Sequence, residues 1–341
     1  MITDAPISDP ASFERLNDLL HRLHDRYNTP EFIADDPISI PHRFFGTANF
    51  HTSNKTIKTS QSNTYLQIHP EHHPRQNDIE IAGFLSATIA WGNRKAIVKS
   101  ASKMMDLLDN APYDFVANSS QNELNRIHSY VHRTFNGADF RAFLLSLRHI
   151  YSKFGSMGAF FETEYARTVA ENSEKSKNSS RILLNINDPE RNVSNFARNI
   201  SDPKPDQNGD LRVVMSRFRQ EFFTPPHAQR CEKHLSSIDR GAACKRLCMF
   251  LRWMIRRDDR GVDFGLWRGI PPSALYLPLD LHSANTARSL GLLSRRVNDW
   301  RSVEEATANL RKFDASDPAK FDFALFGAGI AGEFRDAPVN R

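Results

Sequence analysis

The sequence contains few cysteines and no long apolar run. It has three cysteines among 341 residues, Cys231, Cys244 and Cys248. This odd, small number argues against a disulfide framework and favours a reducing compartment. No stretch reaches the roughly 18 apolar residues that a membrane-spanning helix needs. Residues 1–6 lack the basic and apolar regions of a secretory signal. We therefore expect a cytoplasmic protein without a membrane partner.

Strand signals are also scarce, because alternating apolar and polar residues form no run that supports a sheet. Apolar residues recur instead at helical spacing, which predicts an all-α fold. The hydrophobic share of 40% and the charged share of 25% are ordinary for a soluble globular protein. The expected helices cover residues 11–27, 79–91, 95–108, 139–154, 228–238, 244–257, 280–290, 303–310 and 321–329.

Two polar stretches interrupt these helices. Residues 46–77 are rich in Thr, Ser, Asn, Gln and His, which indicates an irregular or disordered insertion. Residues 172–210 are polar and contain several prolines, which indicates a loop or excursion. The expected organisation is an N-terminal helical segment (1–45), a helical lobe (78–171) and a second lobe (211–341). Asp78 is the expected N-cap of the first helix in the helical lobe.

The positive charge is concentrated in one segment. The net charge is +5, but residues 211–260 contain twelve Lys or Arg and five Asp or Glu. This segment therefore carries +7, and the remainder of the chain sums to about −2. A local basic surface favours phosphate backbones. A solvated helix face is the alternative interpretation.

Lys245 begins the helix expected over residues 244–257. It lies about 150° from the centre of the apolar stripe on that helix. The unpaired amides and the dipole of a first turn disfavour an ammonium ion there. A neutral lysine amine is a nucleophile that can form a Schiff base. A surface lysine near a helix start is the alternative. The stripe consists of Leu247, Phe250, Leu251, Met254 and Ile255.

Asp280 is placed to cap the next helix, because Pro278 enforces an extended approach to it. A capping carboxylate keeps one oxygen free, and a carboxylate near a sugar ring stabilises a developing oxocarbenium ion. Capping alone is the other interpretation. Between residues 238 and 244, a short turn containing Gly241 exposes backbone amides, which can bind a phosphate without regard to sequence.

Three segments together carry a resemblance: 240–246 (Arg-Gly-Ala-Ala-Cys-Lys-Arg), 250–254 (Phe-Leu-Arg-Trp-Met) and 277–282 (Leu-Pro-Leu-Asp-Leu-His). This set resembles the helix-hairpin-helix DNA glycosylase superfamily and is most similar to its 8-oxoguanine glycosylase branches. The runs 78–83 and 321–329 resemble a large uncharacterised bacterial family of the same type. The similarity covers most of residues 28–44, 78–160 and 211–335.

The resemblance implies a two-lobed helical fold and a nucleoid-associated DNA-repair enzyme that acts on double-stranded DNA. A monomer is the simplest expectation for a chain of this size. Lys245 would attack the sugar C1′, with lyase chemistry at the abasic site as a second step. Asp280 would stabilise the oxocarbenium ion. Asn93 or Arg94 would fill the gap left by a flipped base. The implied DNA contacts are Arg240, Gly241, Ala242, Ala243, Arg246, His282, Asn93 and Arg94.

The chain departs from the glycosylase pattern in three ways. The turn lacks the usual second glycine, and Lys245 and Asp280 are 35 residues apart, which is longer than in the commonest members. The three cysteines cannot form the four-cysteine cluster of some relatives, so we expect no iron–sulfur centre and no other cofactor.

Several other features indicate no chemistry of their own. His69, His72 and His73 lie in an irregular run without matching partners, so we expect no metal site. Residues 327–329 (Gly-Ala-Gly) follow no strand and favour close helix packing over a dinucleotide loop. Cys244 is expected to be an ordinary helix-start cysteine, although a reactive thiol is the alternative. Trp253 and Phe250 are expected in the core.

Two other functions stay open at this point. A non-catalytic nucleic-acid-binding protein of the same fold would bind duplex DNA but form no covalent adduct. A small-molecule or protein-interaction module that uses the polar insertions would bind DNA weakly, with a shallow dependence on salt.

Overall fold

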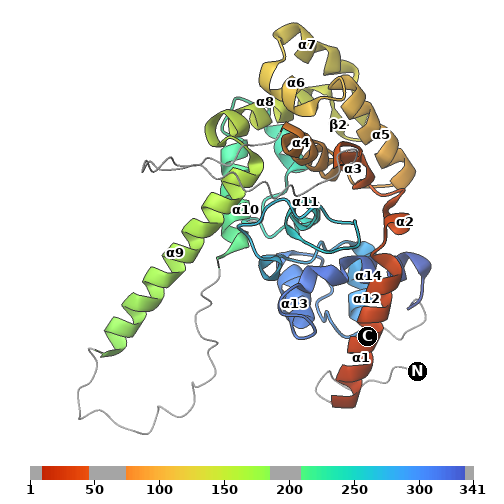
Figure 1. Ribbon diagram of the computed structural model, residues 1–341, viewed down its shortest axis with the longest axis vertical. Helices are drawn as coiled ribbons and strands as arrows, with labels where there is room; N and C mark the ends of the chain where they lie inside the picture. The colour runs from red at the N-terminus through yellow and green to blue at the C-terminus, as the bar shows by residue number, and fades with distance from the viewer. Residues whose placement is uncertain (1–9, 46–73, 185–208, 335–341) are drawn as a thin grey trace, which may run out of the picture.

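The computed structural model describes residues 10–45, 74–184 and 209–334, and most of them are helical (Figure 1). The expected all-α class is confirmed. The α-helices are α1 (Pro10–Tyr27), α2 (Pro30–Ile33), α3 (Ser39–Phe45), α4 (Pro74–Thr88), α5 (Arg94–Leu107), α6 (Pro112–Asn118), α7 (Gln121–Arg126), α8 (Gly137–Phe154), α9 (Met157–Leu184), α10 (Leu211–Phe222), α11 (Lys245–Ile255), α12 (Leu281–Ser289), α13 (Trp300–Arg311) and α14 (Asp322–Ala331).

Shorter elements connect these helices. The strands β1 (Val131–His132) and β2 (Phe135–Asn136) form an antiparallel hairpin in which His132 pairs with Phe135. The 3₁₀ helices are η1 (Ile127–Ser129), η2 (Gln229–His234), η3 (Pro272–Ala274) and η4 (Pro318–Phe321).

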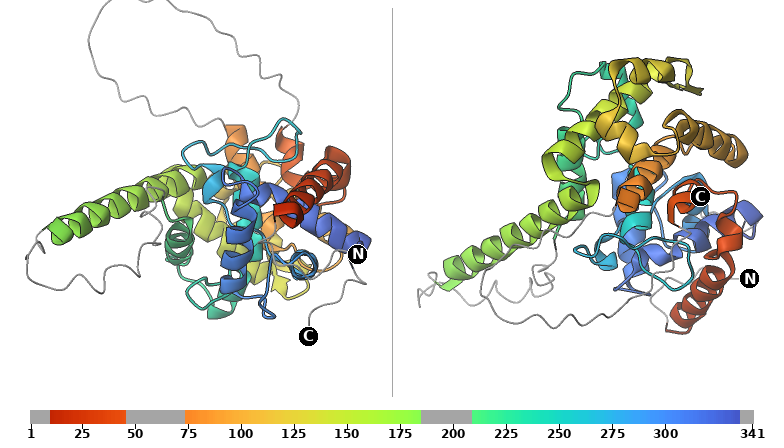
Figure 2. Two further views of the ribbon diagram at one scale, coloured as in Figure 1. Left: turned by 90° about the horizontal axis from the view of Figure 1, so that it is seen from below. Right: turned by 45° about the horizontal axis from the view of Figure 1, so that its top comes forward.

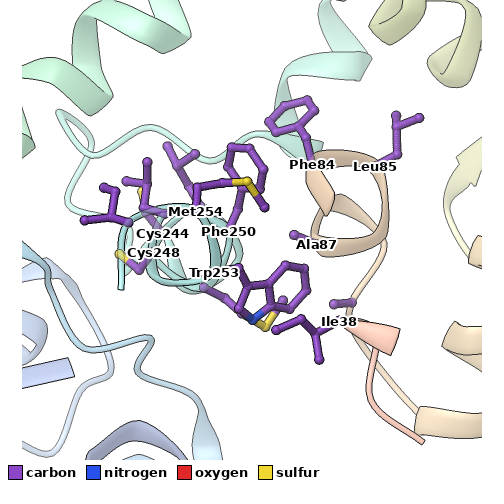
Figure 3. Close-up of a cluster of buried hydrophobic side chains, with 14 of the residues drawn as sticks. Ile38, Phe84, Leu85, Ala87, Cys244, Cys248, Phe250, Trp253 and Met254 are labelled. Carbon is purple, nitrogen blue, oxygen red and sulfur yellow. The ribbon is translucent and has the colours of Figure 1, made fainter. Parts of the chain in front are cut away.

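Helix α11 lies at the centre of the molecule (Figure 1). One side packs on α4, where Phe250 and Met254 point towards Phe84 and Ala87 (Figure 3). Gly83 permits the close approach, since a Cβ atom there would lie only 3.0 Å from the Met254 methyl group. The sequence predicted a helix with one apolar face, but every residue from 247 to 255 is buried. The remaining face is buried because its Arg252 finds acidic partners on other elements.

The helices form two groups around α11, and both groups combine segments that are distant in sequence (Figures 1 and 2). One group contains α4 to α10, and the other contains α1 and α12 to α14. The sequence placed residues 211–341 in one lobe, but α10 packs with α8 and α9. The reason is aromatic packing: the Phe218 ring centroid on α10 is 4.7 Å from that of Phe161 and 5.8 Å from that of Phe84.

The second group depends on small residues of α14. A Cβ atom on Gly327 would lie 2.3 Å from the Tyr27 ring of α1. A Cβ atom on Gly329 would lie 2.8 Å from the His282 carbonyl oxygen of α12. The close helix packing expected for residues 327–329 is confirmed.

The segment expected as a helix over residues 228–238 forms only the 3₁₀ helix η2. Residues at i and i+3 eclipse each other in a 3₁₀ helix. This geometry turns Cys231 and His234 towards the buried Asp139 carboxylate, where the Cys231 thiol donates at 3.2 Å and His234 Nε2 lies 3.3 Å from the second oxygen. The partners available in the fold therefore decide the helix type here.

Two further boundaries differ from expectation. Helix α4 begins at Pro74, so Asp78 lies inside it, where its carboxylate accepts from the Tyr113 amide at 2.9 Å instead of capping. The stretch expected as a loop from residue 172 is helical as far as Leu184, because it contains neither Pro nor Gly before Pro189. Residues 46–73 and 185–208, which contain most of the two polar stretches, lie outside the described residues.

Candidate active site

Lys245 and Asp280 meet at the starts of two helices. Asp280 is the N-cap of α12, and its Oδ1 accepts from the Ser283 amide at 2.9 Å, which confirms the expected cap. Its Oδ2 lies 3.8 Å from Nζ of Lys245, the first residue of α11. The side chains are 28% and 20% exposed, so both can be reached from solvent. One carboxylate oxygen is therefore structural, and the other faces the amine.

A third ionisable group, Asp322, lies close to this pair. It is the first residue of α14, and its carboxylate accepts from Arg252 Nη1 at 2.7 Å. Burial raises the pKa of Asp322, although Arg252 and Lys245 favour its charged form and Asp280 opposes it. Sequence patterns did not single out Asp322. The only available signal was its position at a helix start, since its partner is 70 residues away.

The turn before α11 uses its amides internally. Gly241 has a φ of +78°, and its amide donates to the Ile238 carbonyl at 2.9 Å. The Ala242 amide donates to the Ser237 carbonyl at 3.2 Å. Two of the three amides predicted to hold a phosphate are therefore occupied in the turn itself. Ala243 is half-buried beside them, and Arg240 is exposed.

Arg246 points into the protein. Its guanidinium donates to the Thr88 carbonyl at the end of α4 and stacks over the Trp91 ring, 4.9 Å from the centroid. Burial lowers its pKa to about 10. Arg246, predicted as a DNA contact, thus connects the start of α11 to the end of α4.

Asn93 and Arg94 are also used by the fold. The Asn93 side chain caps α5 by accepting from the Ala96 amide at 3.2 Å. Arg94 donates to Asp36 at 2.7 Å, and its guanidinium lies 5.1 Å from the Phe326 ring centroid. The exposed His282 lies against the same ring, with centroids 6.0 Å apart. Two predicted site residues therefore contact one aromatic ring of α14.

A groove of about 390 Å³ begins immediately after Asp280. It runs between α12 and the end of α14, and at its start Leu281 is 64% exposed. It is comparable in size to a small-ligand site. Its lining residues are Leu281, His282, Asn285, Thr286, Arg288, Ser289, Gly329, Gly332 and Phe334.

The Cys244 thiol is not activated. It is buried, donates to the Ser236 carbonyl at 3.4 Å, and burial raises its pKa to about 12. A protonated thiol is a poor nucleophile. Lys245 is therefore the better nucleophile candidate at this helix start.

Much of the basic charge of residues 211–260 is neutralised by acidic residues elsewhere in the fold. The pairs with acidic residues outside this segment are Arg212–Glu304, Arg217–Glu164, Arg230–Asp139, Lys245–Asp280, Arg252–Asp322, Arg256–Asp317 and Arg260–Asp25. Within the described ranges, Lys233, Arg240 and Arg257 are the exposed cations of this segment without an ion pair. The unpaired positive charge on the surface is therefore confined to fewer residues than the composition of residues 211–260 suggested.

Among the described residues, no group of three or more His, Cys, Asp or Glu could hold a metal ion. His69, His72 and His73 lie outside those residues. No helix in the described part of the chain is both long and apolar enough to cross a membrane.

Comparisons with known proteins identify a family but no activity. No curated protein and no solved structure matches the chain. One family model, described as "Protein of unknown function (DUF2400)", matches residues 67–331. This match includes Lys245, Asp280 and every other predicted site residue, and the resemblance to an uncharacterised family is confirmed. The chain therefore belongs to the DUF2400 family of proteins of unknown function.

Proposed function

We propose that this protein is a DNA-repair glycosylase with abasic-site lyase activity and a helix-hairpin-helix glycosylase-like fold. The observation that carries the proposal is the Lys245–Asp280 pair, whose Nζ and Oδ2 atoms are 3.8 Å apart at two helix starts. A nucleophilic amine beside a fixed carboxylate suits chemistry at a sugar C1′.

The chemistry assigns one role to each group. Nζ of Lys245, in its amine form, attacks C1′, the glycosidic bond breaks, and the base leaves with the bonding electrons and takes up the proton that Nζ releases. The free Oδ2 of Asp280 stabilises the positive charge that develops on the sugar ring. Opening of the ring then gives an iminium ion between Nζ and C1′. Loss of a C2′ proton from this iminium eliminates the 3′-phosphate, which is the lyase step.

The surroundings support a substrate of this kind. Lys245 is in the first turn of α11, and its Nζ lies 3.8 Å from Oδ2 of Asp280, which places the amine beside a fixed carboxylate. The adjacent turn presents the exposed Arg240 to an anionic backbone. The groove beside Leu281 offers concave surface next to the reacting pair.

Borohydride trapping tests the proposal, because borohydride reduces an iminium ion to a stable amine. The full-length protein is incubated with duplexes that contain 8-oxoguanine, uracil, an abasic site or no lesion. Lys245→Ala is compared with Lys233→Ala, which removes an exposed lysine of η2. We expect an adduct with wild type and Lys233→Ala and none with Lys245→Ala. An adduct that persists in Lys245→Ala would refute the assignment of the nucleophile.

A non-catalytic nucleic-acid-binding protein is the second candidate. The ion pair itself favours it, since a lysine that is neutralised by a carboxylate must lose a proton before it can attack. Salt-sensitive duplex binding without any adduct would support this candidate over the enzyme. Weak DNA binding with a shallow salt dependence would support neither and would indicate a small-molecule or protein-interaction module.

A further inference from the structure

We propose that the β1–β2 hairpin is a second contact surface for duplex DNA, in which Val131 fills the gap left by an everted nucleotide and Arg133 contacts the duplex beside it. This inference rests on the proposed function. Apolar side chains that insert between base pairs, accompanied by arginines, are a general device of proteins that distort DNA. The hairpin provides both residue types within three positions.

Val131 is exposed although it is apolar. Its side chain is 62% exposed, whereas the neighbouring His132 and Tyr130 are buried. The hairpin is firmly attached, because Phe135 is fully buried and Arg230 donates to the Thr134 carbonyl at 3.3 Å. A rigid, exposed apolar side chain is what insertion into a base stack requires.

Arg133 is held beside the α4–α5 loop. Its backbone is left-handed, with a φ of 54°, and it has no ion pair with any described residue. Its guanidinium covers Gly92, where a Cβ atom would lie 2.6 Å from Nη1. Gly92 itself has a φ of +107°. Glycine is therefore required at residue 92 by the backbone and by the arginine above it.

Aromatic contacts connect the hairpin to the start of α11. His132 lies against Trp91, with centroids 5.2 Å apart, and Trp91 lies under the guanidinium of Arg246. Arg246 is the residue after Lys245. The hairpin therefore contacts the residue that follows Lys245 through Trp91.

The two residues predicted for this role have partners within the fold. Arg94 is paired with Asp36, and Asn93 caps α5. Arg133 lies over the same loop without such a partner among the described residues. The structure thus offers a replacement for the residues that the sequence suggested.

Fluorescence anisotropy with two labelled duplexes tests the inference. One duplex contains a tetrahydrofuran abasic analogue, and the other is intact. Val131→Thr keeps the β-branched shape but adds a hydroxyl, and Arg133→Asn removes the charge while tolerating the left-handed backbone. Arg22→Asn is the control, since Arg22 is an exposed arginine on α1, at the opposite end of the molecule (Figure 1).

We expect Arg133→Asn to weaken binding to both duplexes by about 10-fold and to lower the salt slope by about one. Val131→Thr should reduce only the preference for the abasic analogue, by about 5- to 10-fold, because an apolar contact in the gap is lost. Arg22→Asn should bind as wild type does. If both hairpin variants match the control while the Lys245 adduct forms normally, the hairpin proposal is wrong and the proposed function stands. If wild type binds neither duplex and forms no adduct, the proposed function fails and the hairpin proposal fails with it.

Discussion

At the scale of single residues, Asp280 has a structural task and a proposed chemical task on separate oxygens. Oδ1 accepts from the Ser283 amide, and Oδ2 faces Lys245. Asparagine is as good an N-cap as aspartate, but it carries no charge. Substitution by Asn and by Ala therefore separates the two tasks.

We expect Asp280→Asn to change the free energy of unfolding by only a few tenths of a kcal/mol, while adduct formation slows by about 10²-fold. Asp280→Ala should slow the adduct similarly and also cost about 1 kcal/mol of stability. Urea unfolding and trapping kinetics measure the two effects. Asp299→Asn is the matched control, because Asp299 caps α13 in the same way, through the Ser302 amide. A wild-type adduct rate in Asp280→Asn would leave Asp280 as a cap alone.

The Asp280 cap could be predicted from the sequence because it depends on neighbouring residues, Pro278 before it and the helix after it. The partners of Arg246 and Arg252 could not be predicted in this way. Arg246 contacts Thr88, 158 residues away, and Arg252 contacts Asn28, 224 residues away. Contacts at such separations leave no local pattern in one sequence.

At the scale of secondary structure, α11 illustrates what a periodic pattern omits. The apolar stripe correctly predicted a helix and its packing face, but the helix is buried on all sides. Its polar face is accommodated because Arg252 donates to Asp322 and Asp263, at 2.7 and 3.1 Å. Breaking a buried ion pair from one side leaves uncompensated charges.

Arg252→Met should therefore destabilise the protein by about 3–5 kcal/mol, since the buried Asp322 loses its ion-pair partner and the buried Asp263 keeps only Arg256. Urea unfolding followed by far-UV circular dichroism measures the change. Arg301→Met, on the exposed face of α13, should lie within about 0.5 kcal/mol of wild type. An equally small effect of Arg252→Met would show that the carboxylates are protonated or hydrated once the arginine is gone.

At the scale of the whole molecule, the sequence predicted the helical class and most long helices, but it did not indicate which helices pack together. The chain crosses between the two groups, so that α1 packs on α14 and α10 packs with α8 and α9. Periodicity indicates which face of a helix is buried, but it does not indicate the helix that covers it. Only the assembled fold places Lys245, Asp280 and Asp322 near one another.

Two buried ionisable side chains, Glu80 and His234, make the stability of the fold depend on pH. Glu80 of α4 accepts from the Tyr151 hydroxyl and the Trp267 indole, both at 2.8 Å, and from the Met157 amide at 3.1 Å. Burial raises its pKa above the usual 4.5. Burial lowers the pKa of His234, near Trp91, from 6.5 to about 4.

The Glu80 and His234 side chains change the stability in opposite directions as pH rises. The folded state binds the Glu80 proton more tightly than the unfolded state, so the contribution of Glu80 is present at low pH and lost as pH rises through its raised pKa. The unfolded state binds the His234 proton more tightly, so the contribution of His234 is present above about pH 6.5 and lost as pH falls towards 4. Compared with wild type, Glu80→Gln should lose less stability as pH rises above about 4.5, the usual pKa of a glutamate. His234→Gln should lose less as pH falls from about 6.5 to 4, by about 2–3 kcal/mol. Urea unfolding across this range measures both differences, and identical pH profiles for the variants and wild type would show that neither group changes its protonation on folding.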